Sequence, residues 1–179
     1  MTSLGVVREK ELGSITNFYA TPVTKLEFLL GKQAPYALLA MINFATLVLL
    51  ALFLFRVPIK GSSAALVLGA FFYVVATTGF GIMFSTFVKT QIAAIFATAI
   101  VTVTPAINFS GYLSPLSSLS GEAKAIGLIF PYGYFQQISM GTFTKALSFN
   151  DLIMNYFALF AIIIAYLTLS LLLLKAQEK

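Results

Sequence analysis

Four long runs of mainly apolar residues, none with a charged side chain, limit most strongly what this chain can fold into. They cover Ala34–Phe55, Ala64–Thr86, Thr90–Tyr112 and Leu152–Leu174. Each is longer than the roughly 20 residues with which an α-helix crosses the hydrocarbon core of a bilayer. Charged residues make up only 9% of the chain, against about 25% in an ordinary soluble domain. The sequence therefore predicts an all-α membrane protein with four transmembrane helices.

The basic residues indicate which way these helices cross the membrane. Four spans place both termini on one side, and seven of the 11 lysines and arginines then lie on that side. The seven are Arg8, Lys10, Lys25, Lys32, Lys89, Lys175 and Lys179, and the other four are Arg56, Lys60, Lys124 and Lys145. Because cytoplasmic loops carry the excess of positive charge, we expect both termini in the cytoplasm.

Residues 113–151 form the one long connection, between the third and fourth spans. Within it Gly127–Thr144 has no charge, but it contains Pro131, Gly133 and the pair Gln136–Gln137, which are costly in lipid. A fifth span would also reduce the charge asymmetry. We therefore expect an external segment of two short re-entrant helices, broken at Pro131–Gly133.

The residue types that are missing exclude several function classes. Without Cys and His the chain has no disulfide, no zinc site and no Cys or His nucleophile, and we expect neither a metal nor a catalytic residue. No ionisable residue lies within the four spans, where ion-driven carriers place their coupling groups. The basic residues are scattered, so we expect a lipid bilayer and no nucleic acid as partner. Any transport must therefore take its energy from elsewhere.

The third span carries a polar stripe at helical spacing, formed by Thr98, Thr102 and Asn108, with Pro105 between. One interpretation is a translocation path along this face. The other is that the threonine hydroxyls bond to carbonyls of their own helix. Five tyrosines are predicted to lie at the membrane interfaces: Tyr36, Tyr112, Tyr132, Tyr134 and Tyr156.

Before the first span, the chain concentrates its charges around an amphipathic stretch. A helix is predicted over Glu9–Ala20, with Leu12, Ile15 and Tyr19 on one face and Phe18 beside them. A second helix then begins either at Thr21–Pro22 or, from a Thr24–Glu27 capping box, three residues later. The stretch suits a lipid-surface helix, a solvated linker or a docking surface for a soluble partner that drives the bundle.

The stretch "VREKELGSITNFYATPVTKLEFLLGKQAPY" resembles the cytoplasmic loop of ABC-2 type permeases, the membrane subunits of ATP-binding cassette exporters. The family pattern is matched at Arg8, Glu9, Glu11, Gly13, Ser14, Thr21, Pro22, Glu27, Gly31 and Lys32. Later segments also match, namely "VPIKGS", "TTGFGIMFSTFVKTQIAA", "FSGYLSP" and "FPYGYF". The resemblance covers essentially the whole chain.

The resemblance implies that residues 9–20 are a coupling helix seated in a groove of a nucleotide-binding domain. Residues 1–33 are then a cytoplasmic coupling segment, 34–179 the transmembrane bundle, and 122–147 the re-entrant pair. ATP and Mg²⁺ are expected on the partner, and no cofactor on this chain. The implied ATPase-coupling interface consists of Glu9, Glu11, Leu12, Gly13, Ser14, Ile15, Phe18, Tyr19, Thr21, Pro22 and Glu27.

More narrowly, the N-terminal stretch resembles the permease end of fused ATP-binding/permease proteins of the ribosome-associated ATPase type. A ribosome association would follow from this resemblance alone. Family permeases have further spans before the coupling loop, and this chain has no Walker A pattern. We therefore expect the non-catalytic C-terminal part of a larger permease in the bacterial inner membrane, paired with a second permease half or its own copy. The alternative is a small non-catalytic membrane scaffold or assembly protein. An intramembrane enzyme fits least, because the spans contain no catalytic dyad.

Overall fold

The computed structural model describes residues 2–11, 24–108 and 127–176, and within them it consists of helices joined by turns and loops. Its elements are α1 (Thr2–Glu11), α3 (Lys25–Phe53), α4 (Ser63–Phe87), α5 (Gln91–Asn108), α7 (Tyr132–Thr144), the 3-10 turn η2 (Asn150–Leu152) and α8 (Ile153–Ala176). The all-α prediction is confirmed for this part of the chain.

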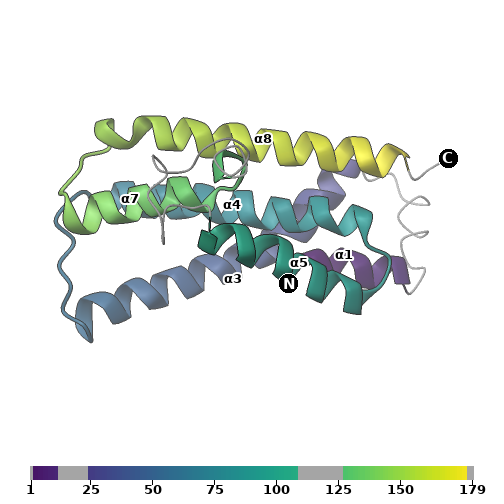
Figure 1. Ribbon diagram of the computed structural model, residues 1–179, viewed down its shortest axis with the longest axis horizontal. Helices are drawn as coiled ribbons and strands as arrows, with labels where there is room; N and C mark the ends of the chain where they lie inside the picture. The colour runs from purple at the N-terminus through teal and green to yellow at the C-terminus, as the bar shows by residue number, and fades with distance from the viewer. Residues whose placement is uncertain (1, 12–23, 109–126, 177–179) are drawn as a thin grey trace.

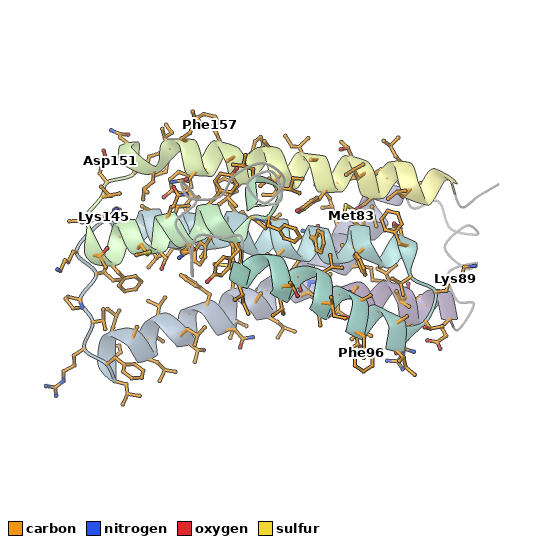
Figure 2. All side chains as sticks on the ribbon, in the orientation of Figure 1. Met83, Lys89, Phe96, Lys145, Asp151 and Phe157 are labelled. Atoms are coloured by element: carbon orange, nitrogen blue, oxygen red, sulfur yellow. The ribbon has the colours of Figure 1, made fainter. Side chains whose placement is uncertain are left out.

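Helix α4 occupies the centre of an elongated bundle and contacts α1, α3, α5, α7 and α8 (Figure 1). The α4–α5 turn, the last residues of α1 and the end of α8 lie at one end, named here the Lys89 end (Figure 2). The loops after α3 and α7 lie at the opposite, Lys145 end. Figure 2 also shows Phe96 and Phe157 pointing away from the bundle, with exposed fractions of 66% and 65%. This outer surface is apolar, as a bilayer requires.

Three of the described helices are long and apolar enough to cross a membrane, namely those over Lys25–Phe53, Ser63–Phe87 and Asn150–Leu173. They correspond to the first, second and fourth predicted spans. The predicted third span, 90–112, is described only as far as Asn108, and its apolar part is a shorter helix. The four-span count therefore stays a prediction.

Helix α3 begins earlier than the first predicted span. Thr24 and Glu27 form the capping box: the Glu27 backbone N–H donates to Thr24 Oγ1 at 3.3 Å, and the Thr24 N–H donates to Glu27 Oε2 at 2.8 Å. The later of the two predicted starts is thus confirmed. The helix continues through Pro35, so the predicted boundary between residues 33 and 34 falls within it.

The predicted break at Pro131–Gly133 occurs one residue earlier. Residues 127–129 are helical, Phe130 and Pro131 interrupt the helix, and Gly133 already lies within α7. With 13 residues, α7 is too short to cross a bilayer. It runs beside α4 and α8 (Figure 1), and Gly69 of α4 permits the close approach, since a Cβ there would lie 2.8 Å from Ile138 Cγ2.

Two expectations are corrected by the packing. Glu9 and Glu11, predicted in the first turn of a helix over Glu9–Ala20, belong to α1, which begins at Thr2 because Val6 and Val7 are buried in the bundle; residues 12–20 lie outside the described part. Tyr156, predicted at a membrane interface, is 5% exposed and belongs to the core formed by α4, α7 and α8. Its hydroxyl donates to the carbonyl of Ala65 at 2.9 Å, which satisfies the phenol inside this core.

Candidate functional site

A cavity of about 380 Å³ lies between α4, α5 and the beginning of α7. Its position follows from the break before α7, because Phe130, Pro131 and Tyr132 at this break form one of its walls. The lining residues come from three separate stretches and are aromatic, aliphatic or small and polar. They are Tyr73, Thr77, Phe80, Thr102, Val103, Phe130, Pro131 and Tyr132.

The aromatic wall of the cavity is fixed by ring contacts between α4 and α7. Tyr73 stacks on Phe135 with ring centroids 4.6 Å apart and planes at 12°. The Tyr132 ring meets Tyr73 edge-on at 6.4 Å. Such offset and edge contacts are preferred by aromatic quadrupoles. The wall is therefore held in place without any ligand.

The segment that interrupts the helix before α7 is anchored from α8. Tyr166 Oη donates to the carbonyl of Ile129 at 3.0 Å. Phe80 contacts both Tyr166 and Phe130, with centroid distances of 5.3 and 5.6 Å. This hydrogen bond satisfies a carbonyl that the interrupted helix would leave without a partner. The interruption is thus stabilised by contacts from α8 and α4, and it supplies part of the cavity wall.

The two threonines of the lining give the cavity its polar chemistry. Thr77 Oγ1 donates to the carbonyl of Tyr73 at 3.0 Å, and Thr102 Oγ1 donates to that of Thr98 at 2.7 Å. Each hydroxyl proton is therefore used within its own helix, and the oxygens remain acceptors. Among the residues that the structure describes, no charged side chain lines the cavity. This arrangement suits an apolar or aromatic molecule that brings its own hydrogen-bond donors.

The structure separates the predicted path residues. Thr102 lines the cavity, whereas Thr98 faces α1 and its Oγ1 donates to Ser3 Oγ at 3.4 Å. The side chain of Asn108 lies outside the described residues. Thr102 combines both interpretations, since its hydroxyl bonds its own helix and also faces the cavity.

Sequence reasoning missed the α4 wall of the cavity. Tyr73, Thr77 and Phe80 recur at i, i+4 and i+7, so they share one helix face, and this spacing was the available signal. Tyr132 had been predicted at a membrane interface, and it lines the cavity.

The acidic residues of the predicted coupling interface have partners within the bundle. Glu9 forms an ion pair with Lys32 of α3. Glu11 Oε2 accepts from the backbone N–H of Gln91 at 3.3 Å and from its Nε2 at 2.8 Å. Glu27 belongs to the capping box of α3. The other predicted interface residues lie outside the described part: Leu12, Gly13, Ser14, Ile15, Phe18, Tyr19, Thr21 and Pro22.

A sequence model of the family described as "ABC-2 family transporter protein" matches residues 1–172. This chain belongs to the ABC-2 family. The ABC-2 match covers α1, the apolar helices and nearly all of α8, so it includes every residue of the cavity.

Named ABC-2 relatives come from Escherichia coli (strain K12). The chain is 31% identical to the "Probable multidrug ABC transporter permease YbhS" over 75% of its length and 36% of the relative's. It is 28% identical to the "Probable multidrug ABC transporter permease YbhR", over 87% and 42% of the two lengths. It is 25% identical to the "Inner membrane transport permease YhhJ", over 96% and 46%.

The chain thus spans less than half the length of these curated relatives. No solved structure matches it. Together, the ABC-2 relatives and the apolar helices indicate a multi-pass protein of the inner membrane.

Proposed function

We propose that this chain forms membrane-spanning helices of an ATP-driven exporter, and that an apolar, aromatic cargo contacts the cavity between α4, α5 and α7. The observation that carries the proposal is the cavity lined by Tyr73, Phe80 and Thr102, whose described lining residues are all uncharged. Family membership supplies the transport context, and two relatives have names that describe multidrug permeases. A cavity with aromatic walls and few polar groups is typical of small-molecule sites.

Hydrolysis of ATP is assigned to an ATP-binding partner, whether separate or fused to the permease, and this chain supplies no catalytic group. Residues 9–20 would dock on that partner, with Leu12, Ile15, Phe18 and Tyr19 filling its groove. A second permease half or a second copy would complete the pathway. An association with ribosomes plays no part in this proposal.

The Lys89 end is proposed to face the cytoplasm. Lys89 lies at this end, Arg8 and Lys25 are close to the ends of α1 and α3 that lie there, and Lys32 is about two turns into α3. The loops at the other end carry Arg56, Lys60 and Lys145. This distribution supports the orientation, because the positive-inside bias acts on residues near the ends of spans.

The contacts of α1 offer a route from the docking segment to the cavity. Helix α1 directly precedes residues 12–23 and contacts α5 through Glu11–Gln91 and Ser3–Thr98. The same helix α5 presents Thr102 to the cavity, one turn beyond Thr98. A displacement of the docking segment would therefore shift the α5 wall.

The test uses the transporter assembled with its ATP-binding partner in proteoliposomes. ATP hydrolysis is measured with and without a panel of neutral aromatic compounds. We expect Thr102→Trp to abolish the stimulation, because the larger side chain occupies the cavity. The matched control is Thr46→Trp, since Thr46 is exposed on α3 and also bonds its own helix, at 2.9 Å to Ile42 O. Full stimulation in Thr102→Trp would contradict the proposal, and a chain that stimulates no ATPase at all would favour the scaffold alternative.

A further inference from the structure

A second hollow, of about 640 Å³, lies between α1 and α3, and its described lining residues all belong to those two helices. It is separate from the cavity described above, because the two share no lining residue. The residues that line it combine charged and apolar side chains: Gly5, Arg8, Glu9, Lys32, Pro35, Tyr36 and Leu39. This hollow is named the α1–α3 groove below.

One end of the α1–α3 groove is positively charged. Arg8 is exposed, and within the described part of the chain its guanidinium has no hydrogen bond or ion pair. Lys32 pairs with Glu9, and the two side chains are 33% and 28% exposed. A lysine ammonium has three donors, so Lys32 can bind a second acceptor while it holds Glu9. With two cations and one anion, the lining carries a net charge of +1.

The other end of the groove is apolar. Along α3, Pro35, Tyr36 and Leu39 follow Lys32 over seven residues, which is about 10 Å at 1.5 Å per residue. Beyond them, Ile42 follows Leu39 by three residues on α3, and its exposed fraction is 54%. The groove therefore changes from basic to apolar along the direction in which a membrane changes from headgroups to acyl chains.

The position of the groove in the bundle agrees with this direction. The capping box at Thr24–Glu27 lies before Lys32, and the uncharged run of α3 begins at Ala34, so Lys32 stands at the border of the apolar stretch. Gly5 of α1 faces Tyr36 so closely that no Cβ would fit there. The tyrosine thus closes the floor of the groove and leaves Arg8 and Lys32 at its rim.

We propose that the α1–α3 groove binds the headgroup of an anionic phospholipid, whose phosphate meets Arg8 and Lys32 and whose acyl chains lie along Leu39 and Ile42. Basic pockets between helices at a membrane border are suited to such headgroups. A guanidinium also matches the geometry of a phosphate through paired donors. The proposal needs only membrane insertion and stands apart from the transport function.

Native mass spectrometry of the full chain, released from micelles with equal amounts of phosphatidylglycerol and phosphatidylcholine of the same acyl chains, tests this directly. We expect retained phosphatidylglycerol to exceed phosphatidylcholine. Arg8→Gln and Lys32→Gln should each lower that preference about fivefold, the factor that one basic residue contributes near an anionic surface. Glu9→Gln should raise it, because Lys32 loses its competing carboxylate.

The control variants distinguish lipid binding at the α1–α3 groove from a general effect of the positive charge of the protein. Lys89→Gln removes an exposed cation at the same end but outside the groove, and it should leave the preference unchanged. Arg8→Lys should keep most of the preference, which guards against a loss caused by misfolding. Equal retention of the two lipids, or an equal loss in Lys89→Gln, would overturn the proposal. So would displacement of the lipid by millimolar inorganic phosphate, which would identify a free anion as the ligand.

Discussion

The side chain of Gln33 on α3 is hydrogen-bonded to Thr78 on α4, with Gln33 Nε2 donating to Thr78 Oγ1 at 3.0 Å and to the carbonyl of Val75 at 2.8 Å. Gln33 is only 4% exposed, and its Oε1 has no partner within the described structure. Thr78 Oγ1 in turn donates to the carbonyl of Val74 at 2.7 Å. This amide is the polar contact that ties the two long helices together.

A double-mutant cycle should measure this contact. With Gln33→Leu and Thr78→Val in bicelles, we expect a coupling free energy of about 0.6 kcal/mol, the average for hydrogen bonds between transmembrane helices. The measurement is the free energy of unfolding by a steric-trapping equilibrium. The small value is expected because Thr78 keeps its bond to Val74 when Gln33 is removed.

The neighbouring Thr77 provides the control for this cycle. Its hydroxyl bonds the carbonyls of Tyr73 and Val74 at 3.0 and 3.1 Å and has no contact to Gln33. The pair Gln33→Leu and Thr77→Val should therefore show no coupling. Equal coupling for Thr77 and Thr78 would mean that the hydrogen bond does not join α3 to α4.

Two glycines should respond to alanine with opposite signs. At Gly69 a Cβ would lie 2.8 Å from Ile138 Cγ2, and Ile138 is fully buried, so Gly69→Ala should lower the free energy of unfolding by about 1–3 kcal/mol. At Gly31 a Cβ would meet nothing within 4 Å, so Gly31→Ala should raise it by about 1 kcal/mol through helix propensity. Equal effects at both sites would show that α7 does not pack on α4 at Gly69.

The end of α7 offers a stabilising substitution. Ala146 has φ of 52° directly after the helix, and the N–H of Leu147 donates to the carbonyl of Gly141 at 3.1 Å. This left-handed position normally holds glycine. We expect Ala146→Gly to raise the apparent melting temperature in detergent, by relieving about 1 kcal/mol of backbone strain.

The matched variant for this prediction is Ala161→Gly on the exposed face of α8. Residue 161 has ordinary helical dihedral angles, so glycine relieves no strain there. The substitution should lower the free energy of unfolding by about 1 kcal/mol. A lower melting temperature in both variants would contradict the left-handed cap at residue 146.

Much of this fold follows from local sequence signals. The charge-free runs predicted α3, α4 and α8, since length and apolarity alone decide whether a helix can span. The capping box at Thr24–Glu27 and the interruption at Pro131 were equally local, because each depends on side chains within a few residues of the backbone that they satisfy.

The parts that sequence reasoning missed depend on tertiary packing. Helix α1 is short, and it is buried against α3, α4 and α5, which are not adjacent to it in the chain, so that Val6 and Val7 are hardly exposed. Short helices gain most of their stability from such contacts. The different surroundings of Thr98 and Thr102, one turn apart, follow from where α1 ends its contact with α5. No periodicity within α5 contains that information.

The contact between Glu11 and Gln91 leads to a test of how α1 is coupled to α5. Glu11 is the last described residue of the predicted docking segment 9–20, and its carboxylate accepts two hydrogen bonds from the first residue of α5. A carboxylate at this position is also favoured by the positive end of the α5 dipole. The contact therefore joins the proposed docking segment to the helix that carries Thr102.

In the transporter assembled with its ATP-binding partner, Glu11→Gln should reduce cargo-stimulated ATP hydrolysis about twofold to fivefold, the factor that a charge at a helix terminus contributes. Phe18→Ala and Gly13→Leu, in the proposed docking face itself, should uncouple ATP hydrolysis from cargo binding more completely, while the bundle still inserts into the membrane.

The exchange Glu11→Gln with Gln91→Glu restores one carboxylate and one amide at the same place. We expect it to recover most of the stimulation, because the amide of residue 11 can then donate to the carboxylate of residue 91, which still lies at the start of α5. Stimulation that is unchanged in Glu11→Gln would show that force does not pass through this contact. Loss in the single variant without recovery in the exchange would place the role of Glu11 on the ATP-binding partner instead of on α5.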